Sequence, residues 1–187
     1  MRTSATDPEH PAPAFAAVAL PPEADAGSWL AAVVERLQAA GFAVGGVNTA
    51  DHDDGPRECR RPMYLCDLLT GERIKISQDL GPAAAGCALD TGQLALAGQA
   101  VYRAIDAGVA LVIVNKFGAQ EAAGKGLRDE LLAAAEAGVP VLTTVKPELV
   151  TAWQEFVGEL GTLLPPDAVQ VEHWCQQICA ARSGERA

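Results

Sequence analysis

Asn115 and Lys116 end the most continuously apolar segment of the chain, Val109 to Asn115. An amide and an ammonium group can hold an anion or a polar ligand, but neither replaces a carboxylate as a magnesium ligand or a general base. A solvated lysine at a strand end is the alternative interpretation of Lys116. The pair predicts a binding site for a small anion and no catalytic residue.

Three arginines gather in one predicted loop, and further polar donors follow it along the chain. Arg57, Arg60 and Arg61 precede Ser77 and Gln78, which end a predicted strand. Guanidinium groups suit tetrahedral oxoanions because their donors form planar forks. A solvated cluster paired with neighbouring aspartates, and an ordinary strand exit at Ser77, stay open as alternatives. All five residues are candidate ligand-binding residues.

The segment from Gly118 to Gly126 lies between a predicted strand and a predicted helix, where a phosphate-binding loop belongs. It departs from the phosphate-loop pattern twice. Five residues rather than four separate Gly118 from Gly124, and Gly126 stands where a hydroxyl residue would hold magnesium. Its backbone amides could still contact an anion without magnesium. Gly118 and Arg128 complete the predicted ligand-binding set.

Cysteine and histidine spacing gives little support for other chemistry. No pair among Cys59, Cys66 and Cys87 has the two-residue spacing of a zinc knuckle. Cys175 and Cys179 stand one helical turn apart and are predicted to be core or surface thiols. No histidine stands beside a nucleophile in an elbow motif, so no hydrolytic triad and no metal site are predicted.

Length and composition set the class of protein. The 187 residues predict a flexible leader at 1–14, a single domain at 15–182 and a tail at 183–187. A net charge of -10 leaves no basic face for nucleic acid, and no apolar run is long enough for membrane insertion. Five irregularly spaced cysteines predict reduced thiols and a cytoplasmic location. The hydrophobic share of 49% and the frequency of symmetric dimers favour a homodimer.

Predicted strands and helices alternate along the chain. The strands are expected at 15–20, 42–47, 109–115 and 140–145, and the helices at 28–40, 90–107, 127–137, 147–160 and 168–181. A hairpin is expected around Thr70-Gly71-Glu72. This order predicts an α/β fold with three layers: a mostly parallel sheet, helices on both faces and an inserted β-hairpin. Ligands in such sheets bind at the carboxyl ends of the strands.

Several sequence blocks occur in an order that resembles the bacterial domain of unknown function 2478 family, often encoded near molybdate-transport genes. They include Gly45-Gly46-Val47, Ile76 to Gly81 and Leu111 to Gly118, and the run from Asn115 to Asp129 is the most specific. More distantly, the layout is similar to the thermophile-type nucleoside triphosphatases of the P-loop class. The segment from Leu20 to Ser28 has no Gly-Lys-Ser/Thr, so the phosphate-loop motif is degenerate.

The resemblance implies a P-loop-NTPase-like fold and a role in molybdenum uptake, storage or cofactor supply. It implies molybdate or tungstate as the bound ligand, with a molybdate transporter or cofactor-assembly proteins as partners. No other cofactor is expected. The alternatives are a nucleotide-binding protein or NTPase with an atypical phosphate loop, and a scaffold that binds nothing small.

Overall fold

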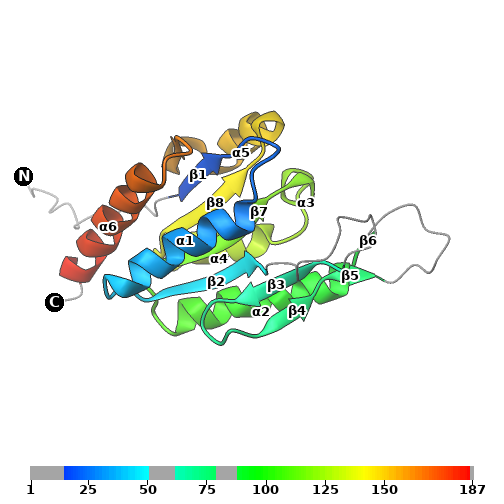
Figure 1. The fold of residues 1–187 in the computed structure, drawn as a ribbon, viewed down its shortest axis with the longest axis horizontal. Coiled ribbons are helices and arrows are strands. Elements are labelled where there is room, and N and C mark those ends of the chain that lie inside the picture. The colour runs from blue at the N-terminus through cyan, green and yellow to red at the C-terminus, as the bar shows by residue number, and fades with distance from the viewer. Residues whose placement is uncertain (1–14, 51–61, 79–87, 186–187) are drawn as a thin grey trace, which may run out of the picture.

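The computed structural model describes residues 15–50, 62–78 and 88–185, which form a central sheet between two layers of helices (Figure 1). Seven strands make up this sheet in the order β4-β3-β2-β7-β8-β1-β9. They are β1 (Phe15–Ala19), β2 (Val44–Thr49), β3 (Tyr64–Asp67), β4 (Arg73–Lys75), β7 (Leu111–Phe117), β8 (Val141–Val145) and β9 (Gly161–Leu164). Two short strands, β5 (Ser77–Gln78) and β6 (Ala88–Leu89), pair with each other outside it.

Five neighbouring strands of the sheet are parallel: β2, β7, β8, β1 and β9. Strand β7 lies in the middle, and its residues from Leu111 to Val114 are completely buried. A continuous apolar run of this kind is expected where helices cover both faces of a parallel strand. The predicted mostly parallel sheet is therefore confirmed.

The predicted hairpin is also confirmed, and it forms one edge of the sheet. Strand β3 is antiparallel to both β2 and β4. The turn between β3 and β4 is held by Asp67, whose Oδ1 accepts the Leu69 N–H at 2.8 Å. Gly71 in this turn has a φ of 74°, a conformation that glycine adopts without steric cost. The hairpin widens the sheet beyond β2.

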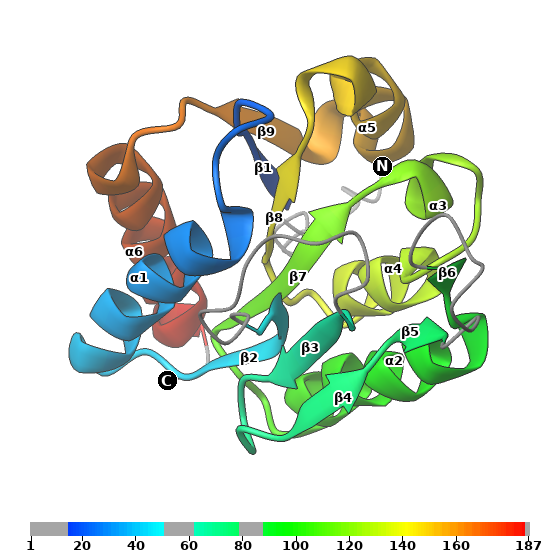
Figure 2. The ribbon, with the colours of Figure 1, turned by 45° about the vertical axis from the view of Figure 1, so that its right-hand side comes forward.

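Helices cover both faces of the sheet, as Figure 2 shows. Helices α1 (Ala26–Ala39) and α6 (Ala168–Glu185) pack on one face. The other face is covered by α2 (Thr91–Asp106), α4 (Arg128–Glu136) and α5 (Val150–Val157). The short α3 (Ala119–Ala122) follows β7, and the 3-10 turns η1 (Pro147–Leu149) and η2 (Gly158–Leu160) flank α5. In the part of the chain that the structure describes, no helix has the length and apolar content needed to cross a bilayer.

Aspartate side chains cap the amino-terminal ends of α1 and α2. Asp90 accepts the Gln93 N–H at 3.0 Å, so the predicted start of α2 is confirmed. Asp25 accepts the N–H groups of Gly27 and Ser28, and α1 therefore starts before the predicted Ser28. Both carboxylates satisfy backbone donors that have no partner within the helix.

The elements also differ from the predictions around β7, around α5 and at β9. Strand β7 extends through Lys116 to Phe117, two residues beyond its predicted end at Asn115. The predicted helix 147–160 is divided into η1, α5 and η2, and Gly158 has a φ of 56° at the break. Strand β9 was not predicted, because its four residues lie at the edge of the sheet and lack a continuous apolar pattern.

Candidate functional site

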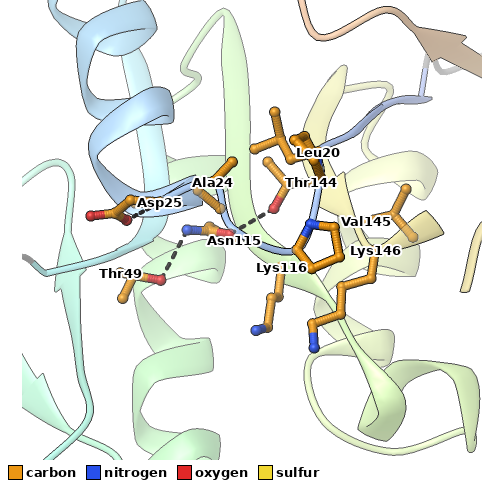
Figure 3. A pocket seen from close by; sticks show the side chains of 13 residues that line it. Leu20, Ala24, Asp25, Thr49, Asn115, Lys116, Thr144, Val145 and Lys146 are labelled. Carbon is orange, nitrogen blue, oxygen red and sulfur yellow. Dashed lines mark hydrogen bonds between the residues drawn. The ribbon is translucent and has the colours of Figure 1, made fainter. Parts of the chain in front are cut away.

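A pocket of about 200 Å³ lies at the carboxyl ends of the parallel strands (Figure 3). The loop from β1 to α1 forms one side, and the ends of β2, β7 and β8 form the rest. Its lining consists of Leu20, Pro21, Pro22, Ala24, Asp25, Ala26, Gly27, Thr49, Asn115, Lys116, Thr144, Val145 and Lys146. Two predicted site residues, Asn115 and Lys116, are therefore in a pocket at the edge of the sheet where ligands of this fold class bind.

Asn115 ties three strands together at the floor of this pocket. Its Nδ2 donates to Asn48 Oδ1 at 2.8 Å and to Thr49 Oγ1 at 2.9 Å. Its Oδ1 accepts the hydroxyl of Thr144 at 2.8 Å. Both amide hydrogens of this buried side chain are thus donated to protein acceptors, and Asn115 shapes the pocket rather than offering a free donor.

Asn48 connects the hydrogen bonds of Asn115 to the first turn of α1. Its Nδ2 donates to the Gly27 carbonyl at 3.0 Å, and its Oδ1 also accepts the Thr49 N–H at 2.9 Å. The β1–α1 loop is consequently fixed relative to the ends of β2 and β7. The Thr49 hydroxyl, which accepts from Asn115, keeps its own hydrogen to donate to a ligand in the pocket.

Lys116 and Lys146 supply the positive charge of the pocket. Figure 3 shows the two side chains side by side, with both amino groups pointing the same way from the ends of β7 and β8. Within the described ranges Lys116 has no ion-pair partner, and the only one of Lys146 is Glu148, at 3.9 Å between two exposed groups. Such surface pairs are weak, so both ammonium groups can turn to an anion.

Lys146 was not among the residues predicted from the sequence to bind a ligand. A signal was present, because Lys146 directly follows a predicted parallel strand and its neighbour Lys116 was recognised on the same grounds. What the sequence did not reveal is that β7 and β8 are adjacent, which brings the two lysines together.

The loop from β1 to α1 occupies the place of a phosphate-binding loop but offers few backbone donors. Pro21 and Pro22 have no N–H group. The Leu20 N–H is donated to the Val145 carbonyl at 3.3 Å, and the Ala24 N–H to the Pro21 carbonyl at 3.0 Å. This loop therefore lacks the run of free amides that cradles a polyphosphate.

The Gly118–Gly126 segment, predicted as a possible anion loop, already contains an anion of the protein. Glu121 is only 5% exposed, and its Oε2 accepts the Gly118 N–H at 2.8 Å. Its Oε1 accepts the Leu127 N–H at 2.9 Å. The Gly118 amide is thus taken by a carboxylate, and within the described ranges Gly118 does not line the pocket.

The other predicted ligand residues are elsewhere. Arg128 lies over the Phe156 ring, 4.3 Å from its centroid, and donates to the Glu121 carbonyl at 3.1 Å. Ser77 is buried, and its hydroxyl accepts the Met63 N–H at 3.0 Å. Gln78 follows it on β5 and is exposed. The structure brings none of these three described residues to the pocket.

The remaining predicted ligand residues are three arginines. Arg57, Arg60 and Arg61 lie outside the described residues, as do Cys59 and Cys87. Across 15–50, 62–78 and 88–185, no three His, Cys, Asp or Glu side chains gather as metal ligands.

Two carboxyl groups, Asp67 and Glu130, are buried away from the pocket and differ in their surroundings. Burial alone would raise the pKa of Asp67, but the Arg103 guanidinium at 2.8 Å and two backbone amides hold that pKa below its usual value. Burial raises the pKa of Glu130, and the neighbouring Asp129 and Glu121 raise it further. Glu130 Oε2 is buried and has no hydrogen-bond partner among the described residues, and the side chain packs against Gly98 of α2. Neither carboxyl is in the pocket.

The thiols of α6 are core groups. Cys175 and Cys179 are completely buried against the sheet. Burial raises the pKa of Cys179 to about 11 and that of Cys175 further. Thiols with such raised pKa values contain little thiolate, which is the nucleophilic form.

Comparisons with known proteins agree with this fold. Residues 15–174 match the family described as Protein of unknown function (DUF2478). The chain is 43% identical over 159 residues to "Molybdenum import ATP-binding protein ModC 2" of Bradyrhizobium diazoefficiens. That match covers 85% of this chain but only 18% of the relative, so the chain corresponds to a small part of a longer protein.

A solved structure, that of THEP1 from the hyperthermophile Aquifex aeolicus, has the same architecture. The TM-score is 0.56 at 13% sequence identity, and the alignment covers 88% of this chain and 95% of that one. At this identity the likeness shows the fold alone. The predicted P-loop-NTPase-like α/β class is confirmed.

Proposed function

This chain belongs to the DUF2478 family, and we propose that it binds a small tetrahedral oxoanion, molybdate or tungstate, in molybdenum uptake, storage or cofactor supply. The observation that carries the proposal is the pair of lysines, Lys116 and Lys146, that end adjacent parallel strands above a small pocket. An oxoanion with two negative charges matches two ammonium groups in both charge and hydrogen-bonding capacity.

The local charge supports an anionic ligand despite the acidity of the whole chain. The net charge is -10, yet the charged groups lining the pocket are Lys116, Lys146 and Asp25. The carboxylate of Asp25 accepts hydrogen bonds from the first turn of α1. Two cations therefore remain for a ligand, and the Thr49 hydroxyl adds a neutral donor at the end of β2 in the lining of the same pocket.

The size of the pocket supports a small ligand. Its volume of about 200 Å³ is below the range of roughly 300–1,000 Å³ that is usual for drug-sized organic ligands. A tetrahedral ion with a few water molecules fits such a space. Lys116 and Lys146 would contact the ion directly, while Asn115 would hold the strand ends at the correct separation.

The molybdenum assignment is supported by the relative named as a molybdenum import ATP-binding protein. A segment similar to this chain is a minor part of that longer protein. We therefore propose that the chain acts on the ion that such an import system handles, with a transporter component or a cofactor-assembly protein as its partner.

Nucleotide binding is the second candidate, favoured by the P-loop-NTPase-like fold. Two features weigh against it. The β1–α1 loop contains Pro21 and Pro22 in place of a Gly-Lys-Ser/Thr motif, and β7 has Asn115 and Lys116 near its carboxyl end, where magnesium would require a carboxylate.

Isothermal titration calorimetry with molybdate, tungstate, sulfate and phosphate tests the proposal. We expect Lys116→Ala and Lys146→Ala each to weaken molybdate binding about tenfold, the loss of one charged hydrogen bond. Lys125→Ala is the matched control, because it removes the same charge from an exposed loop outside the pocket. Equal binding by the lysine variants and the wild type would rule out this pocket as the site. Sulfate bound as tightly as molybdate would support an oxoanion pocket but contradict the molybdenum assignment.

A further inference from the structure

The start of α1 determines which anions the pocket can accept. We propose that Asp25 restricts the pocket to small free oxoanions, because its carboxylate occupies the backbone amides that a phosphate chain would need. This inference rests on the proposed oxoanion function and names the class of ligand that the same site excludes. It makes Asp25 a specificity-determining residue.

Asp25 acts as an internal anion on the first turn of the helix. Its Oδ1 accepts the Gly27 N–H at 3.0 Å and the Ser28 N–H at 3.3 Å. Its Oδ2 accepts the Ser28 hydroxyl at 2.8 Å. Free amides at a helix N-terminus are the groups that bind phosphate in P-loop proteins, since they combine donors with the positive end of the helix dipole. Here these donors already have a carboxylate as their partner.

Four of the preceding residues offer no free amide in place of these donors. Pro21 and Pro22 have none, and the N–H groups of Leu20 and Ala24 are donated to protein carbonyls. Gly27 is also packed closely, because a Cβ added there would lie 3.1 Å from the Cβ of Thr49. A polyphosphate that entered along this loop would find a carboxylate and few amides.

The Gly118–Gly126 loop is closed to phosphate in the same way. Glu121 accepts the N–H groups of Gly118 and Leu127 from its buried position. In two segments that the structure describes, the start of α1 and the Gly118–Gly126 loop, backbone amides are thus bound by the chain's own carboxylates. Among the described side chains that line the pocket, Lys116 and Lys146 offer ammonium groups and Thr49 offers a hydroxyl donor.

The negative charge of Asp25 also disfavours a phosphate chain in the pocket. Asp25 lies on the α1 side of the pocket, and the two lysines lie on the β7–β8 side (Figure 3). A compact dianion can stay beside the lysines, whereas a chain of phosphates long enough to reach α1 would bring its charge against the Asp25 carboxylate. Asp25 is exposed, so solvent screens this repulsion and its contribution is smaller than that of the occupied amides.

Calorimetry on Asp25 variants tests the inference. Asp25→Gly exposes the amides of Gly27 and Ser28 while keeping a residue that is tolerated at a helix N-cap. We expect its affinity for pyrophosphate to rise about tenfold or more, since a phosphate gains charge-assisted hydrogen bonds and loses a repelling carboxylate. Molybdate affinity should change much less. Glu23→Gly is the matched control, because it removes the same charge from an exposed position in the same loop.

A second variant protects the test against misfolding. Asp25→Asn retains an oxygen that can cap the helix but removes the charge, so its gain in pyrophosphate affinity should be smaller than that of Asp25→Gly and larger than that of Glu23→Gln. Thermal melting of each variant checks its folding.

The outcomes separate this inference from the proposed function. The inference is wrong if the wild type binds pyrophosphate as tightly as molybdate, or if the Asp25 variants gain no more than the Glu23 variants. Failure of the wild type to bind any oxoanion would instead remove the proposed function. Even then, the comparison of the Asp25 and Glu23 variants with pyrophosphate would decide whether Asp25 blocks the amides.

Discussion

Replacing Asn115 by aspartate places a carboxylate at the end of β7 and tests whether the amide ties the sheet together. The wild-type Nδ2 donates to Asn48 Oδ1 at 2.8 Å and to Thr49 Oγ1 at 2.9 Å, in a side chain only 4% exposed. A carboxylate has the same size and can still accept the Thr144 hydroxyl. It has no hydrogen for the other two contacts, so one of its oxygens would face the Asn48 oxygen.

The expected loss follows from these contacts. Two donated hydrogen bonds contribute about 1 kcal/mol each, and a buried charge facing an acceptor costs about 1–3 kcal/mol more. Thr49 can rotate its hydroxyl and recover about 1 kcal/mol, whereas Asn48 is fixed by its bonds to Gly27 and to the Thr49 amide. We therefore expect Asn115→Asp to lower the free energy of unfolding by about 3 kcal/mol at pH 7.5.

Urea denaturation at pH 7.5 and pH 5 measures this loss. With a slope of about 2 kcal/mol per molar urea, the midpoint should fall by about 1.5 M at pH 7.5. The deficit should become smaller at pH 5, because burial favours protonation of the introduced carboxyl and the protonated form can donate. Gln99→Glu adds the same charge at an exposed helical position and should change stability by less than about 0.5 kcal/mol. An Asn115→Asp protein as stable as the wild type at both pH values would refute the proposed cross-strand role of the amide.

Three further outcomes are expected. Glu130→Gln should raise the free energy of unfolding by about 1 kcal/mol at pH 8, because burial raises the pKa of Glu130 and its ionisation opposes folding. The gain should shrink as the pH falls and the wild-type carboxyl becomes protonated; a difference independent of pH would argue against this cause. In mass-spectrometric mapping of iodoacetamide labelling at pH 8, Cys175 and Cys179 should react only after unfolding, and rapid native labelling would contradict their burial. In urea denaturation, Gly126→Ala should destabilise the protein by about 1–2 kcal/mol more than Gly124→Ala. Both positions have positive φ, but only a Cβ at position 126 would collide with the buried Glu121 carboxylate. Equal losses would refute that contact.

The fold could be predicted because its signals are local. The apolar run that contains β7 indicates a strand covered on both faces, and Asp90 marks the start of α2 through its own side chain. The turn with Gly71 likewise identifies the hairpin. Each of these features depends on residues that are close together in the chain.

The organisation of the site could not be predicted to the same extent, because it depends on which strands are adjacent. Asn115 was expected to hold the ligand, but its partners Asn48 and Thr144 lie 67 and 29 residues away in sequence. A periodic pattern does not give strand order. For the same reason Lys116 was recognised alone, without its neighbour Lys146.

The internal carboxylates were missed for a different reason. The start of α1 was predicted at Ser28 from the spacing of apolar residues, which does not include the capping side chain of Asp25. Glu121 lies within a glycine-rich segment whose amides were considered available to a ligand. In both cases the side chain that satisfies the backbone is near in sequence, and a search for acidic residues beside unpaired amides would have found it.

A crystal of the protein soaked with tungstate would test the central claim most directly, because the tungsten atom identifies both the ligand and its position through anomalous scattering. We predict one dominant peak in the pocket, with oxyanion oxygens within hydrogen-bonding distance of Lys116 Nζ and Lys146 Nζ, and no such peak in the Lys116→Ala/Lys146→Ala double variant. An empty pocket at millimolar tungstate, or a peak that persists unchanged in the double variant, would contradict the proposed site.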